Sequence, residues 1–197
     1  MKKSIEEEKE NKQVKNKMYV QLERCKKDLQ KDPSNPALHV RMGDLYIKWH
    51  LDIYNSGQYI DEAITEYQLA MESLLDSHEI FYKLGFAFYI KGDLDKAISY
   101  FTTALEKKNR YYDAYYMLAE TFVKKAHFTD AIDACEAAIM CSRFSSSSAH
   151  YLLYKLYNAL SYRDFKTKVK AVVEKIKAII LAPFDAKAIN DIFTNLS

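Results

Sequence analysis

The sequence predicts an all-α protein, a right-handed solenoid of helical hairpins. Only 4 glycines and 3 prolines occur in 197 residues, and these two residue types punctuate turns and break helices. Small and large apolar residues also recur at an offset of 34, the length of one helix–turn–helix unit. Long helices, short connections and a repeating unit together indicate hairpins that stack one on the next.

The repeat is clearest in the middle of the chain. The offset of 34 pairs Leu84 with Leu118, Gly85 with Ala119, Phe88 with Phe122, Ala97 with Ala131, and Ala104 with Ala138. Small residues where two helices cross let their axes approach closely, and large neighbours fill the space beside the crossing. A turn is expected at Lys91-Gly92-Asp93, with Asp93 as the N-cap of the second helix.

These residues resemble the signature of the tetratricopeptide-repeat family, and the resemblance extends over about Pro33 to Leu181. The match is almost full at Leu84, Gly85, Phe88, Ala97, Phe101 and Ala104. The next unit departs from it at Cys135, where the family usually has an aromatic residue. The resemblance implies a scaffold that binds other proteins through the concave face of its stacked hairpins.

The pattern divides the chain into a capped solenoid of about three clear repeats and a degenerate fourth. We expect a polar helix that covers the first repeat or frays at 1–32, a solenoid at 33–182 with units at about 36–77, 78–111, 112–145 and 146–182, and a capping helix at 183–197. The first unit has eight extra residues between Tyr46 and Ala63. They are expected to lengthen its helices by about two turns, either as a partner-specific feature or as a neutral insertion.

The second helix of the fourth unit combines an apolar stripe with lysines. The stripe consists of Phe165, Val169, Val172, Val173, Ile176 and Ile180. We expect it to pack on the preceding repeat. The alternative is a basic amphipathic helix that meets a membrane surface or a calmodulin-type partner.

The first helices of the units supply the predicted binding groove. The candidate residues are Tyr82, Lys83, Phe86, Tyr89, Asp113, Tyr116, Glu120, Lys124, His150, Tyr151, Tyr154 and Tyr157. Tyrosine offers a large apolar face and a hydroxyl and loses little rotamer entropy on binding. The predicted anchors are Tyr82, Phe86, Tyr89, Tyr116, Tyr151 and Tyr154, with Lys83 and Lys124 selecting charge. Alternatively, several of these tyrosines pack between adjacent helices.

One known use of the family is not expected here. Members that grip the C-terminal carboxylate of heat-shock chaperones use two asparagines and basic residues. The corresponding positions hold Val40, Asp44, Lys83, Asp113 and Met117. Two of these are acidic and only one is basic, so binding of a chaperone tail by that clamp is not predicted.

The remaining features disfavour other classes of function. The 5 histidines are dispersed without HExxH spacing, the 3 cysteines form no CxxC pair, and no glycine-rich phosphate loop occurs. We therefore expect no enzyme, metal, cofactor or small-molecule substrate. Net charge is +2 and no long apolar run or signal peptide is seen, which favours a cytoplasmic protein without a membrane span.

The expected partner is another protein, bound as an extended peptide or an amphipathic helix. An alternative is a chaperone of secreted or assembling apolar segments, similar to the compact repeat chaperones of bacterial secretion systems. An RNA-binding helical repeat is less favoured because the predicted groove carries several carboxylates. Self-association is compatible with the sequence as well.

Overall fold

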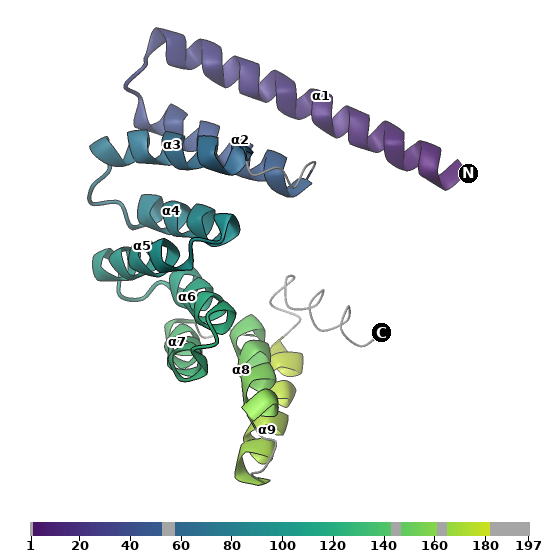
Figure 1. Ribbon diagram of the computed structural model, residues 1–197, viewed down its shortest axis with the longest axis vertical. Helices are drawn as coiled ribbons and strands as arrows, with labels where there is room; N and C mark the ends of the chain where they lie inside the picture. The colour runs from purple at the N-terminus through teal and green to yellow at the C-terminus, as the bar shows by residue number, and fades with distance from the viewer. Residues whose placement is uncertain (1, 53–57, 143–146, 161–164, 182–197) are drawn as a thin grey trace. The chain divides into compact units, whose positions relative to one another are not determined.

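The computed structural model describes residues 2–52, 58–142, 147–160 and 165–181, and every regular element in these ranges is an α-helix (Figure 1). The helices are α1 Lys2–Lys31, α2 Pro36–Asp52, α3 Gln58–Ser73, α4 His78–Lys91, α5 Leu94–Lys107, α6 Tyr112–Lys124, α7 Phe128–Cys141, α8 Ser147–Leu160 and α9 Phe165–Leu181. The predicted fold class is therefore confirmed. The capping helix expected at 183–197 lies outside the described residues.

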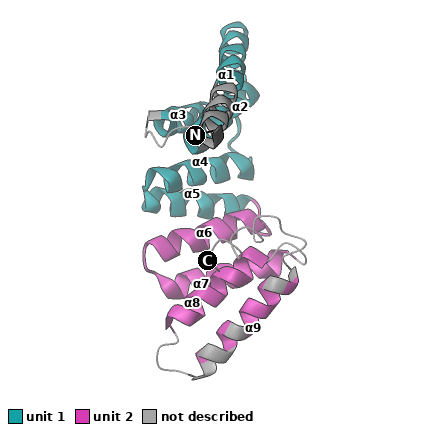
Figure 2. Ribbon diagram, turned by 90° about the vertical axis from the view of Figure 1, so that its right-hand side faces the viewer, with its two compact units in different colours: residues 1–107 teal, residues 108–197 magenta. Residues whose placement is uncertain are grey.

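The chain forms two compact units (Figure 2). The first, residues 1–107, contains α1 and the hairpins α2/α3 and α4/α5; the second, residues 108–197, contains the hairpins α6/α7 and α8/α9. Within the first unit α1 packs on α2 and α3 packs on α4, and within the second α7 packs on α8. Within each hairpin the two helices pack on each other.

The half of α1 nearer α2 carries the apolar residues that join it to the first hairpin. Leu22 and Cys25 form a buried cluster with Met42 of α2, and Leu29 packs against this cluster. The first hairpin is also longer than its neighbour, because α2 and α3 have 17 and 16 residues while α4 and α5 have 14 each. The inserted residues thus lengthen each helix by less than one turn, and residues 53–57 lie outside the described ranges.

The centre of each of the first three hairpins is a small residue on the first helix facing a larger one on the second. A Cβ atom on Gly43 would lie 2.4 Å from the Tyr67 ring, and one on Gly85 would lie 2.7 Å from the Phe101 ring. Both rings are buried, so they have little room to move. At the same places the third hairpin has Ala119 and Cys135, which are both buried. In this hairpin the residue on the first helix is larger than the glycine of the other two, and the residue on the second helix is smaller than their aromatic ring.

The turn of the second hairpin has the conformation that the sequence predicts. Gly92 is left-handed, with φ of 90°, and its N–H bonds to the Tyr89 carbonyl while that of Asp93 bonds to the Phe88 carbonyl. These two bonds complete a Schellman motif. The carboxylate of Asp93 accepts from the N–H of Lys96 at 3.3 Å, which confirms Asp93 as the N-cap of α5.

The third hairpin makes the same turn with an alanine. Ala126 has φ of 59°, and the N–H of His127 bonds to the Phe122 carbonyl at 2.9 Å. Ala126 thus takes the left-handed position that Gly92 occupies one repeat earlier. An L-residue with a Cβ is strained in this conformation by roughly 1–2 kcal/mol.

The apolar stripe of α9 is not packed as expected. The exposed fractions of Val173, Ile176 and Ile180 are 43%, 52% and 65%. Packing of α9 on α8 instead uses the buried Ala171 and Ala178. The prediction that the stripe covers the preceding repeat is therefore wrong for these three residues. Small residues let α9 approach α8 closely, and Val173, Ile176 and Ile180 lie on the side of the helix that faces away from it.

The Ala126→Gly variant is expected to be more stable than the wild type. Removing the Cβ relieves the left-handed strain and is opposed by the greater entropy of glycine in the unfolded chain, which leaves a gain of about 0.5–1 kcal/mol. Chemical denaturation measures the change in free energy of unfolding. Gly92→Ala is the matched control and should lose a similar amount, because no atom lies within 4 Å of its added Cβ. A loss of stability in Ala126→Gly would contradict this account.

Gly85→Ala is expected to destabilise the protein by about 1–3 kcal/mol, because the new methyl group overlaps the Phe101 ring. The double variant Gly85→Ala/Phe101→Cys reproduces the Ala119 and Cys135 pair of the third hairpin. In it, the methyl group no longer meets a ring, so the two substitutions should couple favourably by about the same amount. A double-mutant cycle in denaturant measures the coupling. Strict additivity would show that the glycine is not required by the ring.

Candidate functional site

Helix α4 in the first unit carries a row of aromatic side chains beyond those that fill the hairpin core. Tyr82, Phe86 and Tyr89 are each partly exposed. The rings of Tyr82 and Phe86 are stacked, with centroids 6.5 Å apart and planes 17° apart. Tyr82 also leans on the buried Phe101 at 5.8 Å. Tyr82 and Phe86 thus form a stacked pair that rests on the core through Tyr82, with Tyr89 partly exposed on the same helix.

Lys83 is held beside this row by residues of the first hairpin. Its ammonium donates to the Asp44 carboxylate at 2.6 Å and lies 5.9 Å from the centroid of the Tyr67 ring. The Tyr67 hydroxyl donates to the same carboxylate at 2.7 Å. Burial, together with the Asp44 charge, raises the pKa of Tyr67. The predicted charge-selecting lysine is therefore already paired within the protein and links α4 to α2.

Four predicted groove residues lie on α6. Two of them are buried or hydrogen-bonded within the protein, and the other two are exposed. Tyr116 is 8% exposed, stacks on Tyr112 at 6.1 Å and donates to the Glu120 carboxylate at 2.9 Å. Asp113 and Lys124 are exposed. The structure therefore places most of the ring of Tyr116 in the interior, and the accessible polar groups among the predicted groove residues of α6 are Glu120, Asp113 and Lys124.

His150 on α8 is buried and joins the two helices of its hairpin. Its Nδ1 bonds to the carboxylate of Glu174 on α9, and Lys177 donates to the same carboxylate at 2.8 Å. Burial acts to raise the pKa of Glu174, but the hydrogen bonds from Lys177 and His150 outweigh it and lower that pKa. The sequence predicts that His150 lines the groove, whereas in the structure its side chain is buried and bonds to a residue of the neighbouring helix.

The three tyrosines of α8 are partly exposed, and each has a lysine over its ring. Lys155 lies 4.7 Å from the centroid of Tyr151, Lys175 lies 5.4 Å from that of Tyr154, and Lys170 lies 5.6 Å from that of Tyr157. Tyr157 also donates to Glu136 of α7 at 3.2 Å. Burial, followed by the Glu136 charge, raises the pKa of Tyr157 to about 12. The surface of this hairpin is therefore a mixed aromatic and cationic one.

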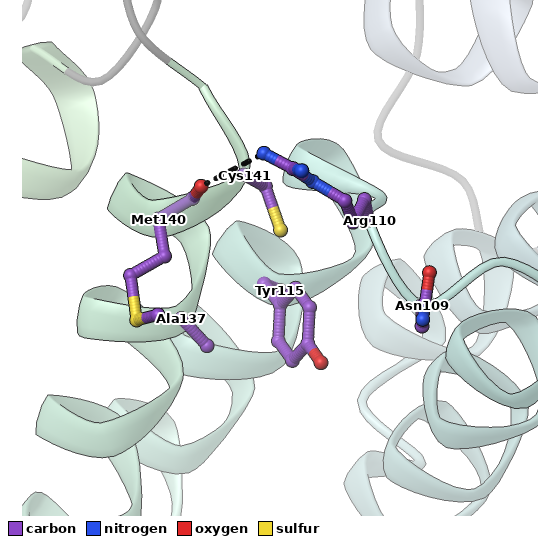
Figure 3. Close-up of a pocket in the computed structure, with 6 residues that line it drawn as sticks. All are labelled: Asn109, Arg110, Tyr115, Ala137, Met140 and Cys141. Carbon is purple, nitrogen blue, oxygen red and sulfur yellow. Dashed lines mark hydrogen bonds between the residues drawn. The ribbon is translucent and has the colours of Figure 1, made fainter.

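The structure contains a groove that the sequence did not lead us to expect, along α6 and α7 of the third hairpin. One pocket of about 370 Å³ is lined by Asn109, Arg110, Tyr115, Ala137, Met140 and Cys141. A second, of about 310 Å³, is lined by Tyr115, Leu118, Phe122, Asp130, Asp133, Ala134 and Ala137. The two pockets share Tyr115 and Ala137 and thus adjoin. Figure 3 shows the Tyr115 ring facing Ala137, with Arg110 donating to the Met140 carbonyl at 3.5 Å.

A signal for this groove is present in the sequence. An offset of 34 in the sequence aligns Phe81 with Tyr115 and Phe88 with Phe122. The same offset aligns Tyr100 with Ala134. An aromatic residue is therefore missing from an otherwise matching set. The repeat of 34 residues is recognised from core positions at which successive hairpins have similar residues. This groove lies at a position where the third hairpin lacks a large side chain that the second one has.

The described residues contain no metal site and no membrane span. No group of three or more His, Cys, Asp or Glu side chains in them could hold a metal ion. Among the described helices, none combines the length and apolar character needed to cross a bilayer.

Comparison with known proteins agrees with the geometry. Residues 88–156 match the family model for the tetratricopeptide repeat, and no match is found among curated proteins. Residues 88–156 therefore belong to the tetratricopeptide-repeat family, and the chain has the fold of that family.

Several solved structures share this fold. The structure of MamA is 24% identical with a TM-score of 0.72, over 89% of this chain and 95% of that one. YrrB, described as a TPR protein with an unusual peptide-binding site, is 18% identical with a TM-score of 0.64, over 91% of this chain and 85% of that one. TTC0263, a thermophilic TPR protein in Thermus thermophilus, is 15% identical with a TM-score of 0.66, over 93% and 92% of the two chains.

The three free cysteines are expected to differ in reactivity. Cys25 and Cys135 are buried, and burial raises the pKa of both thiols, whereas Cys141 is partly exposed. Because the thiolate is the reactive form, a chromogenic disulfide reagent should modify Cys141 first in the native protein and all three thiols in denaturant. Cys141→Ser should abolish the fast phase. A fast phase that persists in this variant would show that a buried site opens readily.

Proposed function

We propose that this protein is a non-enzymatic scaffold that binds an extended peptide or an amphipathic helix of a partner protein on the aromatic row of α4. The observation that carries the proposal is the partly exposed row of Tyr82, Phe86 and Tyr89. The core of its hairpin is already filled by buried residues such as Phe81, Leu84 and Phe88.

The row has the properties of an interaction surface. Aromatic side chains dominate the binding energy of protein interfaces because they bury a large area at low entropic cost. The ion pair of Lys83 with Asp44 supplies a polar edge next to the apolar row, as in interfaces with an apolar centre and a polar rim. The likeness to a peptide-binding TPR structure supports a protein partner.

Selection from a peptide-display library tests this function. Peptides that bind the wild type should contain apolar anchors, and the variant Phe86→Ala/Tyr89→Ala should bind them about thirtyfold or more weakly, which corresponds to about 2 kcal/mol. Tyr82 is left in place because it contacts Phe101 in the core. Circular dichroism should show unchanged helix content.

Tyr19→Ala is the matched control, because it removes an exposed aromatic side chain from α1 and should leave binding unchanged. Binding of the selected peptides should depend weakly on salt. Equal affinity of the wild type and the α4 variant would refute the proposed site. Steep salt dependence together with capture of RNA would instead favour a nucleic-acid partner.

A further inference from the structure

We propose that the third hairpin carries a second binding site, a slot on α6 and α7 that takes an aromatic side chain next to a basic one from a partner protein. This site lies in residues 108–197 and does not depend on the function proposed for α4.

In the second hairpin the corresponding space is filled by the protein itself. The ring of Tyr100 on α5 lies over Phe88 with centroids 5.4 Å apart and planes 6° apart, and it lies 6.5 Å from Phe81. The ammonium of Lys96 lies 5.1 Å from the centroid of Phe88. An aromatic ring and a cation thus occupy adjacent places on this hairpin.

In the third hairpin the aromatic ring and the cation at these two places are both absent, while the aromatic residues that they would contact remain. The offset of 34 replaces Phe81 and Phe88 with Tyr115 and Phe122 but replaces Tyr100 with Ala134. The pocket of about 310 Å³ lies among these three residues. Its size is at the lower end of the range for ligand pockets, and the side chain missing from it is an aromatic ring.

The charge at the edge of the pocket indicates which side chain of the partner should accompany the aromatic one. Asp130 stands where the second hairpin has Lys96, and both Asp130 and Asp133 line the pocket. His127 lies 3.5 Å from Asp130 and stacks on Phe122 at 6.3 Å, which makes this end of the slot polar. Two carboxylates beside aromatic faces attract a lysine or arginine side chain. The slot therefore fits an aromatic–basic pair and disfavours an aromatic–acidic one.

Capped dipeptides test the proposal directly. The probes are N-acetyl-tyrosyl-lysine amide, the alanyl-lysine peptide, and the tyrosyl-glutamate peptide, titrated into the full chain and followed by NMR chemical shifts. We expect the tyrosyl-lysine peptide to bind at about millimolar concentration and the other two about tenfold or more weakly. Shifts should concentrate at α6 and α7. Equal binding of all three peptides would overturn the proposal.

Two variants locate the site. Ala134→Tyr restores the side chain that the second hairpin has, so it should fill the slot, keep the helices and weaken tyrosyl-lysine binding at least about tenfold. Asp130→Lys/Asp133→Lys changes exposed side chains only, so it should preserve the fold and reverse the preference in favour of the tyrosyl-glutamate peptide. Unchanged affinity and preference in these variants would overturn the site, and the charge variant decides the matter if Ala134→Tyr does not fold.

The α4 variant Phe86→Ala/Tyr89→Ala separates this proposal from the preceding one. It should bind the tyrosyl-lysine peptide like the wild type, since both substitutions lie in the first compact unit. Loss of dipeptide binding in this variant would assign the peptide to α4 and would refute the slot.

Discussion

The contact between a small residue on the first helix of a hairpin and a larger one on the second sets the geometry of the other interactions. Where Gly85 meets Phe101, the ring sits directly against the helix backbone. The contact sets the distance between the two helix axes, and this distance decides which side chains are covered and which remain at the surface. Tyr67 shows the consequence at the first hairpin, because the ring that packs on Gly43 places its hydroxyl on Asp44. The core contact thereby positions a polar cluster that also holds Lys83.

Most of the fold could be predicted from the sequence because its determinants are local and repeated. The period of 34 identified the hairpins, and Gly92 and Asp93 specified a turn whose hydrogen bonds the structure shows. The third hairpin makes the same turn around Ala126, which no turn signal in the sequence indicates. In this hairpin the tertiary contacts of two helices impose a conformation that the residue does not favour by itself.

The surface could be predicted less well, because exposure depends on what each helix meets. Tyrosines at matching positions look alike in the sequence, yet Tyr116 is buried while Tyr82 is partly exposed. His150 bonds to a glutamate on the next helix, a pairing across 24 residues that periodicity does not reveal. The orientation of α9 that exposes Ile180 is likewise set by the small residues Ala171 and Ala178, which carry less weight in a hydrophobic pattern than large ones.

The third hairpin combines a cysteine at its centre, an alanine in a left-handed turn and an open pocket at its surface. Each of these features reduces the free energy that holds α6 and α7 together relative to α4 and α5, whose corresponding places are filled by Phe101, Gly92 and Tyr100. Stability in a repeat array is a sum of local contributions, so opening motions should concentrate in this hairpin and amide hydrogens there should exchange earliest among the central repeats. A partner that fills the slot would then act as a missing part of the core, and its binding would slow this exchange.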